Sequence, residues 1–193
     1  MRMHVSVPAL STPVPAVVVI QHQGGVDEFV QNMTHRLADR RIINDVNACV
    51  GFLQRHEGVA RDRIGIVGFC MGGRVVYLMA AANPVFTAAV AYYGGNIFRA
   101  WGRDLPSPFE RTAEIHCPLQ GHFGAEDKNP SPDDMARLDA ELNKFSKPHE
   151  FFSYPNAGHG FMDSTKESYR GDADEASWPR TLDFFRQYLD VRR

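Results

Sequence analysis

Residues 63–74, Arg-Ile-Gly-Ile-Val-Gly-Phe-Cys-Met-Gly-Gly-Arg, decide how this chain of 193 residues folds. The run from Ile64 to Val67 is short and apolar, as expected of a buried strand. The strand pattern ends at Gly68, and apolar residues at helical spacing follow within a few positions (Val75, Val76, Leu78 and Met79). Cys70 lies between the two patterns, with Gly68 and Gly72 two residues away on either side. This spacing predicts a nucleophile elbow, a sharp strand-to-helix turn, with cysteine where serine is usual.

An elbow would place Cys70 at the N-terminus of a helix. Unpaired N–H groups and the helix dipole favour a thiolate at that position. The N–H of Met71 would point at the carbonyl oxygen of a bound substrate and form half of an oxyanion hole. The alternative is a small buried hydrophobe, which is the common role of a cysteine after a strand. The coincidence of strand, turn and a helix that opens with two glycines favours the elbow.

Composition indicates one globular domain over residues 1–193. The sequence is 44% hydrophobic and carries a formal net charge of -2, which gives no electrostatic basis for binding nucleic acid or a membrane surface. Three cysteines (Cys49, Cys70 and Cys117) are too few for a disulfide framework, so we expect a reduced, cytoplasmic setting. We find no signal peptide and no apolar run long enough to span a membrane.

Strand and helix patterns alternate along the chain, which predicts an α/β fold with a mostly parallel, doubly wound sheet flanked by helices. Strands are expected over residues 3–7, 15–20, 64–67, 86–93, 115–123 and 149–154. Helices are expected over residues 26–40, 42–53, 71–82, 132–145 and 178–189. The helix near residue 132 has a clear start, because Ser131 is a good N-cap and a proline and two acids follow it.

Two of these helical patterns meet at Arg40 and Arg41 with no strand between them. A doubly wound sheet needs a strand there, because each crossover helix returns the chain to the sheet. Either the fold is abridged at this point, or a strand and its loop are missing from the sequence. We favour a missing segment.

Two further reactive side chains follow predicted strands. Asp127 follows the strand that ends near Phe123, and His159 follows the strand that ends at Tyr154. Parallel strands bring their carboxyl ends to one edge of the sheet, where ligands bind. The order cysteine, acid, histidine therefore predicts a triad of Cys70, Asp127 and His159. Asp127 has a rival in Glu126 and could instead cap a turn, whereas His159 lies between two glycines and is hard to explain as a core residue.

Three motifs resemble the dienelactone hydrolase family: residues 68–73 (Gly-Phe-Cys-Met-Gly-Gly), 123–127 (Phe-Gly-Ala-Glu-Asp) and 154–161 (Tyr-Pro-Asn-Ala-Gly-His-Gly-Phe). The resemblance extends over most of the chain from residue 16. It implies an α/β-hydrolase fold and a Cys70-His159-Asp127 triad that cleaves small-molecule esters or lactones through an acyl-cysteine intermediate. It also implies no metal or organic cofactor. The N–H of Gln23 would be the second oxyanion donor by analogy.

The sequence also departs from the family pattern. His22 stands where the family has a glutamate that contacts the resting cysteine. A glutamate disfavours the thiolate and a histidine does not, so we expect Cys70 to be more thiolate-like and more readily oxidised than in members with the glutamate. His22 could equally be a solvent-facing loop residue. Asp163 stands where dienelactone-specific members have an arginine for the substrate carboxylate, which argues against dienelactone itself as the substrate.

Other candidates depend on less specific patterns. Tyr92, Trp101 and Phe161 lie near strand ends or in a long loop, where they would line an apolar substrate pocket or pack the core. Cys117 lies near His116 and His122, but the spacing matches no metal motif and we predict no metal. The alternatives to ester hydrolysis are thioesters or organophosphate esters as substrates, or a catalytically silent protein with a binding or redox role. The oligomeric state is expected to be a monomer or homodimer.

Overall fold

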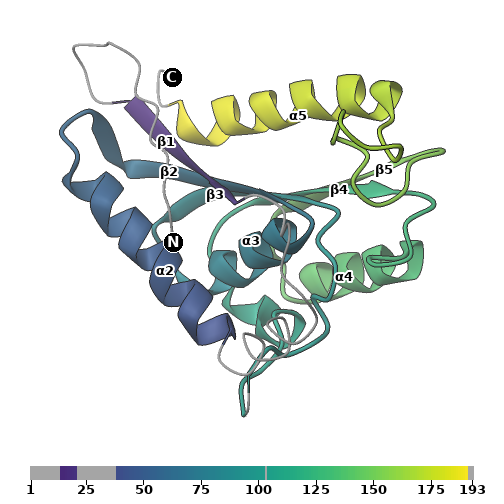
Figure 1. Ribbon diagram of the computed structural model, residues 1–193. Helices are drawn as coiled ribbons and strands as arrows, with labels where there is room; N and C mark the ends of the chain where they lie inside the picture. The colour runs from purple at the N-terminus through teal and green to yellow at the C-terminus, as the bar shows by residue number, and fades with distance from the viewer. Residues whose placement is uncertain (1–13, 21–37, 103, 191–193) are drawn as a thin grey trace.

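Five parallel strands form the centre of the computed structural model, which describes residues 14–20, 38–102 and 104–190 (Figure 1). The strands are β1 (Val14–Ile20), β2 (Val59–Phe69), β3 (Phe86–Tyr92), β4 (Leu119–Gly124) and β5 (His149–Tyr154). Each strand pairs in parallel with the next one along the chain. The predicted α/β class is confirmed. The strand expected over residues 3–7 and the loop with His22 and Gln23 lie outside the described residues.

Helices cover both faces of this sheet (Figure 1). One face carries α2 (Ala38–Arg55), α3 (Met71–Ala82), the short 3-10 helix η1 (Phe109–Glu114) and α4 (Pro132–Lys144). The other face carries α5 (Gly171–Leu189). Right-handed crossovers between neighbouring parallel strands place their helices on one face. Helix α5 can cover the other face because it follows the last strand.

The sheet separates two apolar clusters. Ile66 on β2 and Met79 on α3 belong to the cluster beneath α2, α3 and α4, whereas Val67 on β2 and Phe184 on α5 belong to the cluster beneath α5. Successive side chains of a strand point to opposite faces. Strand β2 is therefore apolar on both faces, as a covered parallel strand must be.

Helix α2 corrects one prediction about boundaries. Arg40 and Arg41 lie within a single continuous helix, so the predicted break between two helices at this point is wrong. The buried Asp39 extends the helix towards its N-terminus, because its carboxylate pairs with Arg74 of α3 at 2.6 Å and fixes the first turn. Between β1 and β2 the described residues, 38–58, contain this helix and no strand.

Strand β4 begins later than the sequence predicts. It starts at Leu119 and not at Ile115, since Pro118 lacks the N–H that a strand would use. His116 consequently lies before the strand and is exposed, whereas His122 lies within it and is fully buried. Of the two histidines, His122 alone belongs to the strand.

The predicted start of α4 is confirmed in detail. The Ser131 side chain accepts a hydrogen bond from the Asp134 backbone N–H, and the Asp134 side chain accepts one from the Ser131 N–H. This is a capping box, which satisfies two otherwise unpaired donors at the helix start. None of the described helices is long and apolar enough to cross a membrane.

Candidate active site

A strained turn holds Cys70 between β2 and α3. It is the single residue between these two elements and has φ 57° and ψ -119°, outside the regions that L-residues favour. The turn needs glycine at position 68, because a Cβ there would lie 2.3 Å from the carbonyl oxygen of Gly72. The Cys70 N–H donates to the Tyr92 carbonyl oxygen at 3.0 Å, which ties the turn to the end of β3. The strand-turn-helix geometry expected of an elbow is confirmed.

A second close approach brings α3 against the end of β3. A Cβ on Gly73 would lie 2.6 Å from the Tyr92 carbonyl oxygen, and one on Gly94 would lie 2.7 Å from the Gly73 carbonyl carbon. Both glycines allow two backbones to pass at a distance that side chains would prevent. The sulfur of Cys70 is thereby held at the carboxyl edge of the sheet.

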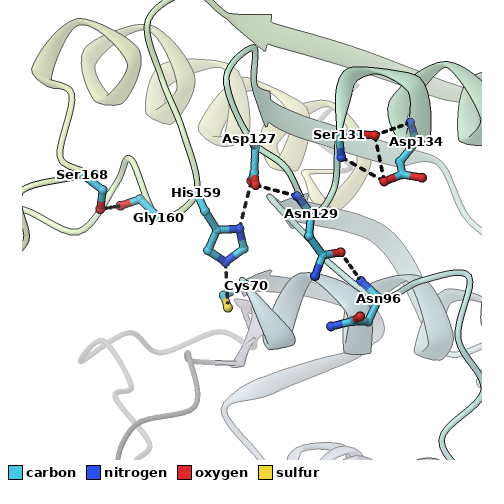
Figure 2. Close-up of polar contacts among 9 residues, drawn as sticks. All are labelled: Cys70, Asn96, Asp127, Asn129, Ser131, Asp134, His159, Gly160 and Ser168. Atoms are coloured by element: carbon cyan, nitrogen blue, oxygen red, sulfur yellow. Dashed lines mark hydrogen bonds and ion pairs between the residues drawn. The ribbon is translucent and has the colours of Figure 1, made fainter.

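Asp127 and His159 reach the same edge from β4 and β5 (Figure 2). The loops after these strands are joined, since the Glu126 N–H donates to the Ala157 carbonyl oxygen at 2.9 Å. His159 Nδ1 lies 2.9 Å from Asp127 Oδ2, and His159 Nε2 lies 2.9 Å from Cys70 Sγ. The structure thus brings together the three side chains that the sequence proposes as a triad.

The three side chains are buried to different degrees. The Asp127 carboxylate is 3% exposed, the His159 imidazole is 39% exposed and Cys70 is half-buried. A buried carboxylate keeps its hydrogen bonds out of competition with water. The sulfur and the imidazole remain accessible to a small molecule that enters from solvent.

Charge favours a thiolate next to an imidazolium. The hydrogen bonds to Asp127 and to Cys70 raise the pKa of His159 to about 10, against the opposing effect of burial. Burial raises the pKa of Cys70, but the hydrogen bond and charge of His159 and the N–H of Met71 outweigh it, so the pKa is lowered overall. An imidazolium and a thiolate in contact each stabilise the charged form of the other. The Met71 N–H acts on the sulfur from the first residue of α3.

The aromatic residues proposed for a substrate pocket lie in the interior. Tyr92 and Phe161 are both 0% exposed, and the Tyr92 hydroxyl is hydrogen-bonded to Thr181 of α5 at 2.7 Å. Trp101 is 6% exposed, and its ring stacks on the Arg74 guanidinium at 3.7 Å. These three side chains support the elements that carry the site and do not line its open side.

Tyr93 is a site residue that the sequence analysis missed. Its ring meets the His159 imidazole edge-on, with the ring centroids 5.2 Å apart, and its backbone has φ 37°. Burial, followed by the charges of Cys70 and Asp163, raises the pKa of its hydroxyl, so it stays neutral. The available signal was its place at the end of β3, between the strands that carry Cys70 and Asp127.

Comparisons with known proteins give the family. The sequence pattern of the dienelactone hydrolase family matches residues 38–189. A Bradyrhizobium protein provisionally named 2-oxo-3-(5-oxofuran-2-ylidene)propanoate lactonase is 33% identical over 86% of this chain and 67% of its own length. A crystal structure from Klebsiella pneumoniae, provisionally identified as a dienelactone hydrolase, superposes with a TM-score of 0.80 at 26% identity, covering 94% of this chain and 91% of that one.

A relative from Methylorubrum extorquens bears on the missing segment. This protein, provisionally named carboxymethylenebutenolidase, is 28% identical over 95% of this chain and 75% of its own length. The alignment extends over 219 residues, more than the 193 residues of this chain, so the relative contains residues that have no counterpart here. This supports the expectation that the chain lacks a segment that its relatives have. Pattern, relatives and structure agree, and the chain belongs to the dienelactone hydrolase family of α/β-hydrolases, enzymes that hydrolyse ester bonds.

Proposed function

We propose that this protein hydrolyses carboxylic esters or lactones through an acyl-cysteine intermediate formed on Cys70. The observation that carries the proposal is the unbroken series of contacts from Asp127 through His159 to the Cys70 sulfur, at 2.9 Å for each contact. The names of the relatives, a lactonase and a carboxymethylenebutenolidase, support a cyclic ester as the substrate class.

Acylation begins with the thiolate. Cys70 Sγ attacks the carbonyl carbon, an S–C bond forms, and the carbonyl electron pair moves onto oxygen. The Met71 N–H stabilises this oxyanion, and the Gln23 N–H is proposed as the second donor, so that the negative charge has donors in place before it develops. The oxyanion then collapses, the C–O bond breaks, and His159 Nε2 gives its proton to the leaving alkoxide. In a lactone that alcohol stays attached to the acyl group.

Deacylation uses the same residues, with the direction of proton transfer at His159 reversed. Neutral His159 takes a proton from water, and the resulting hydroxide attacks the acyl-cysteine carbonyl carbon. The C–S bond breaks, the carboxylic acid leaves, and the thiolate-imidazolium pair is restored. Asp127 holds Nδ1–H throughout and stabilises the imidazolium, which is the role of the carboxylate in triads of this kind.

The proposal extends to the conditions in which the protein works. The chemistry uses side chains alone, so we propose a small-molecule substrate with no metal or organic cofactor. It needs Cys70 as a free thiol, which fits a reduced, cytoplasmic setting. No step requires a residue from a second copy, so a monomer or a homodimer would serve.

Ester hydrolysis with cysteine variants tests the proposal. Wild-type protein is expected to release p-nitrophenol from p-nitrophenyl acetate, and Cys70→Ala is expected to reduce kcat by more than ~1000-fold, as removal of a triad nucleophile does. Cys49→Ala is the matched control, because Cys49 is also half-buried but lies on α2, and it should leave the rate unchanged. Mass spectrometry of rapidly quenched wild type should find one acetyl group on Cys70.

Two results would count against this function. Hydrolysis that survives in Cys70→Ala would show that another group does the chemistry. Wild-type protein that cleaves a thioester or an organophosphate ester but neither a carboxylic ester nor a lactone would show that the substrate class is wrong.

A further inference from the structure

The carboxylate of Asp127 is held at both of its oxygens. Oδ2 lies 2.9 Å from His159 Nδ1, and Oδ1 accepts a hydrogen bond from the Asn129 backbone N–H at 2.9 Å (Figure 2). The second bond lies within the loop between β4 and α4. The direction in which Oδ2 points therefore depends on the shape of that loop at Asn129.

The side chain of Asn129 fixes the loop from outside. Its Oδ1 accepts a hydrogen bond from the Asn96 backbone N–H at 2.9 Å, which joins the loop after β4 to the loop after β3 (Figure 2). Gly95 makes room for it, because a Cβ there would lie 2.8 Å from the Asn129 carbonyl oxygen and 3.0 Å from its Cγ. Asn129 is thus bound on one side to Asp127 and packed on the other against Gly95 and Asn96.

The loop after β3 is in turn anchored to the helix that follows Cys70. The Asn96 carbonyl oxygen accepts from Arg74 Nε at 3.2 Å, and the Arg74 backbone N–H donates to the Cys70 carbonyl oxygen at 3.3 Å. The Arg74 side chain is 0% exposed and pairs with both carboxylate oxygens of Asp39, at 2.6 and 2.9 Å. A guanidinium held by so many partners has little freedom to move.

These contacts close a ring around the site. The ring runs in order through Cys70, Arg74, Asn96, Asn129, Asp127 and His159 and returns to Cys70. One half is the proposed triad, and the other half sets the distance between the turn that carries the thiol and the loop that carries the acid. Asn129 is the member that joins the two halves.

We propose that Asn129 is a positioning residue for Asp127: by joining the loop after β4 to the backbone of Asn96, it keeps the carboxylate aimed at His159 and so keeps His159 over Cys70. The inference rests on the proposed function for its importance to catalysis. Asn129 touches no reacting atom and acts only through Asp127. The capping box of Ser131 and Asp134 starts α4 just beyond this point and makes no contact with Asp127 among the interactions of the described residues.

Two substitutions at position 129 test whether the hydrogen bond from the Asn96 N–H is what matters. Asn129→Ala removes the oxygen that receives the Asn96 N–H, whereas Asn129→Asp keeps an oxygen in the same place. Asn143→Ala is the matched control, because Asn143 is an exposed asparagine on α4 whose side chain bonds only to Asp139 among the hydrogen bonds of the described residues. The thermal unfolding midpoint is measured for each variant, so that any general loss of stability is known.

The decisive readout is the rate of Cys70 alkylation by iodoacetamide as a function of pH. In Asn129→Ala the midpoint should rise by about 0.5–1 pH unit, because a less well-held Asp127 stabilises the His159 cation less and the thiolate with it. The kcat for p-nitrophenyl acetate should fall about tenfold with little change in KM, since misplacing a catalytic group by about 1 Å can cost ~100-fold. Asn129→Asp should keep a midpoint closer to that of wild type than Asn129→Ala does, and Asn143→Ala should match wild type in both assays.

A variant at another position keeps the test informative if Asn129→Ala fails to fold. Gly95→Ala keeps the asparagine at position 129 but adds a methyl group 2.8 Å from its carbonyl oxygen and 3.0 Å from its Cγ. It should displace Asn129 and shift the alkylation midpoint in the same direction as Asn129→Ala. The proposal is overturned if Asn129→Ala and Gly95→Ala keep the wild-type midpoint, or if Asn129→Asp shifts it upward as far as Asn129→Ala does. Alkylation needs no substrate, so a wild-type protein that fails to hydrolyse esters would sink the proposed function and leave this test intact.

Discussion

Cys70 combines a strained backbone with a side chain that is held by its neighbours. Residues in unusual φ/ψ regions cost about 1–3 kcal/mol and persist only where the surroundings enforce them. Here the enforcement comes from the Cys70 N–H bond to the Tyr92 carbonyl and from the glycines on either side. The strain places the sulfur above the helix start, within reach of His159 Nε2.

Removal of the imidazole should return Cys70 to the behaviour of a buried thiol. Because the hydrogen bond and charge of His159 are what lower the pKa of Cys70 against burial, His159→Gln should move the midpoint of iodoacetamide alkylation above the ordinary thiol value. In wild type the midpoint should lie below that value. Equal midpoints for the two proteins would show that the imidazole does not stabilise the thiolate. His56, which is half-buried just after α2 and makes no contact with Cys70 among the interactions of the described residues, provides the control, and His56→Gln should behave as wild type.

Sequence analysis proposed the three side chains that the structure brings together and missed the residues around them, for a physical reason. Cys70 and His159 have glycines on both sides, and Asp127 follows Gly124. All three come after a strand, and a role in the core does not explain this pattern. Tyr93 also lies at a strand end before two glycines, but a tyrosine at a strand end and an asparagine in a loop are ordinary and do not by themselves indicate a place in an active site. Tyr93 contacts His159, which lies 66 residues later in the sequence, and Asn129 bonds to Asn96, which lies 33 residues earlier. Only the fold creates such contacts.

At the scale of elements, the junction of β2 and α3 leaves no room for a side chain at position 68. Gly68→Ala would place Cβ 2.3 Å from the Gly72 carbonyl oxygen, which is backbone and cannot rotate away. We expect the free energy of unfolding to fall by about 3–5 kcal/mol, at the upper end of the range for single substitutions. Urea denaturation followed by circular dichroism measures it.

A glycine at which a Cβ meets no close neighbour is the control for this substitution. A Cβ on Gly171, at the start of α5, would lie 3.8 Å from the ring of Tyr169, an ordinary van der Waals distance. Gly171→Ala should therefore change stability by less than about 1 kcal/mol. A Gly68→Ala protein as stable as Gly171→Ala would show that the elbow relaxes more easily than its geometry indicates.

Element types were easier to predict than their ends. The spacing of apolar residues predicted helices over residues 42–53 and 71–82, but it does not show where a helix that continues beyond its apolar residues begins. The N-terminal part of α2 is held by the buried pair of Asp39 and Arg74, a contact 35 residues apart in sequence. Strand β4 was predicted four residues too long at its start, because apolar Ile115 packs into the core without joining the sheet.

At the scale of the whole molecule, a buried polar network fastens α5 to the sheet. His122 of β4 is fully buried, with Nδ1 at 2.7 Å from the Tyr154 hydroxyl and Nε2 at 2.7 Å from Gln120 Oε1. Thr181 of α5 joins this network at 3.1 Å from His122 Nε2. Burial, assisted by the charge of Arg180, lowers the pKa of His122 to about 3, so it is neutral in the folded protein at ordinary pH.

Stability should consequently fall in mild acid. Between the ordinary histidine pKa of about 6.5 and the folded value of about 3, the unfolded chain binds a proton at this position that the folded chain does not. The contribution of His122 to the free energy of unfolding is fully present above pH 6.5 and is lost as the pH falls, by at most about 1.4 kcal/mol per pH unit. Urea denaturation of wild type and His122→Gln from pH 7 to pH 4 measures the difference, and parallel pH profiles would exclude His122 as its source.

The spacing of the triad along the chain has a consequence for the newly made protein. His159 follows Cys70 by 89 residues and Asp127 by 32. A ribosome therefore releases the thiol long before the imidazole that ionises it. Until the C-terminal third has emerged and docked, we expect Cys70 to behave as an ordinary thiol, so that the nascent polypeptide reacts more slowly with electrophiles than the folded protein does.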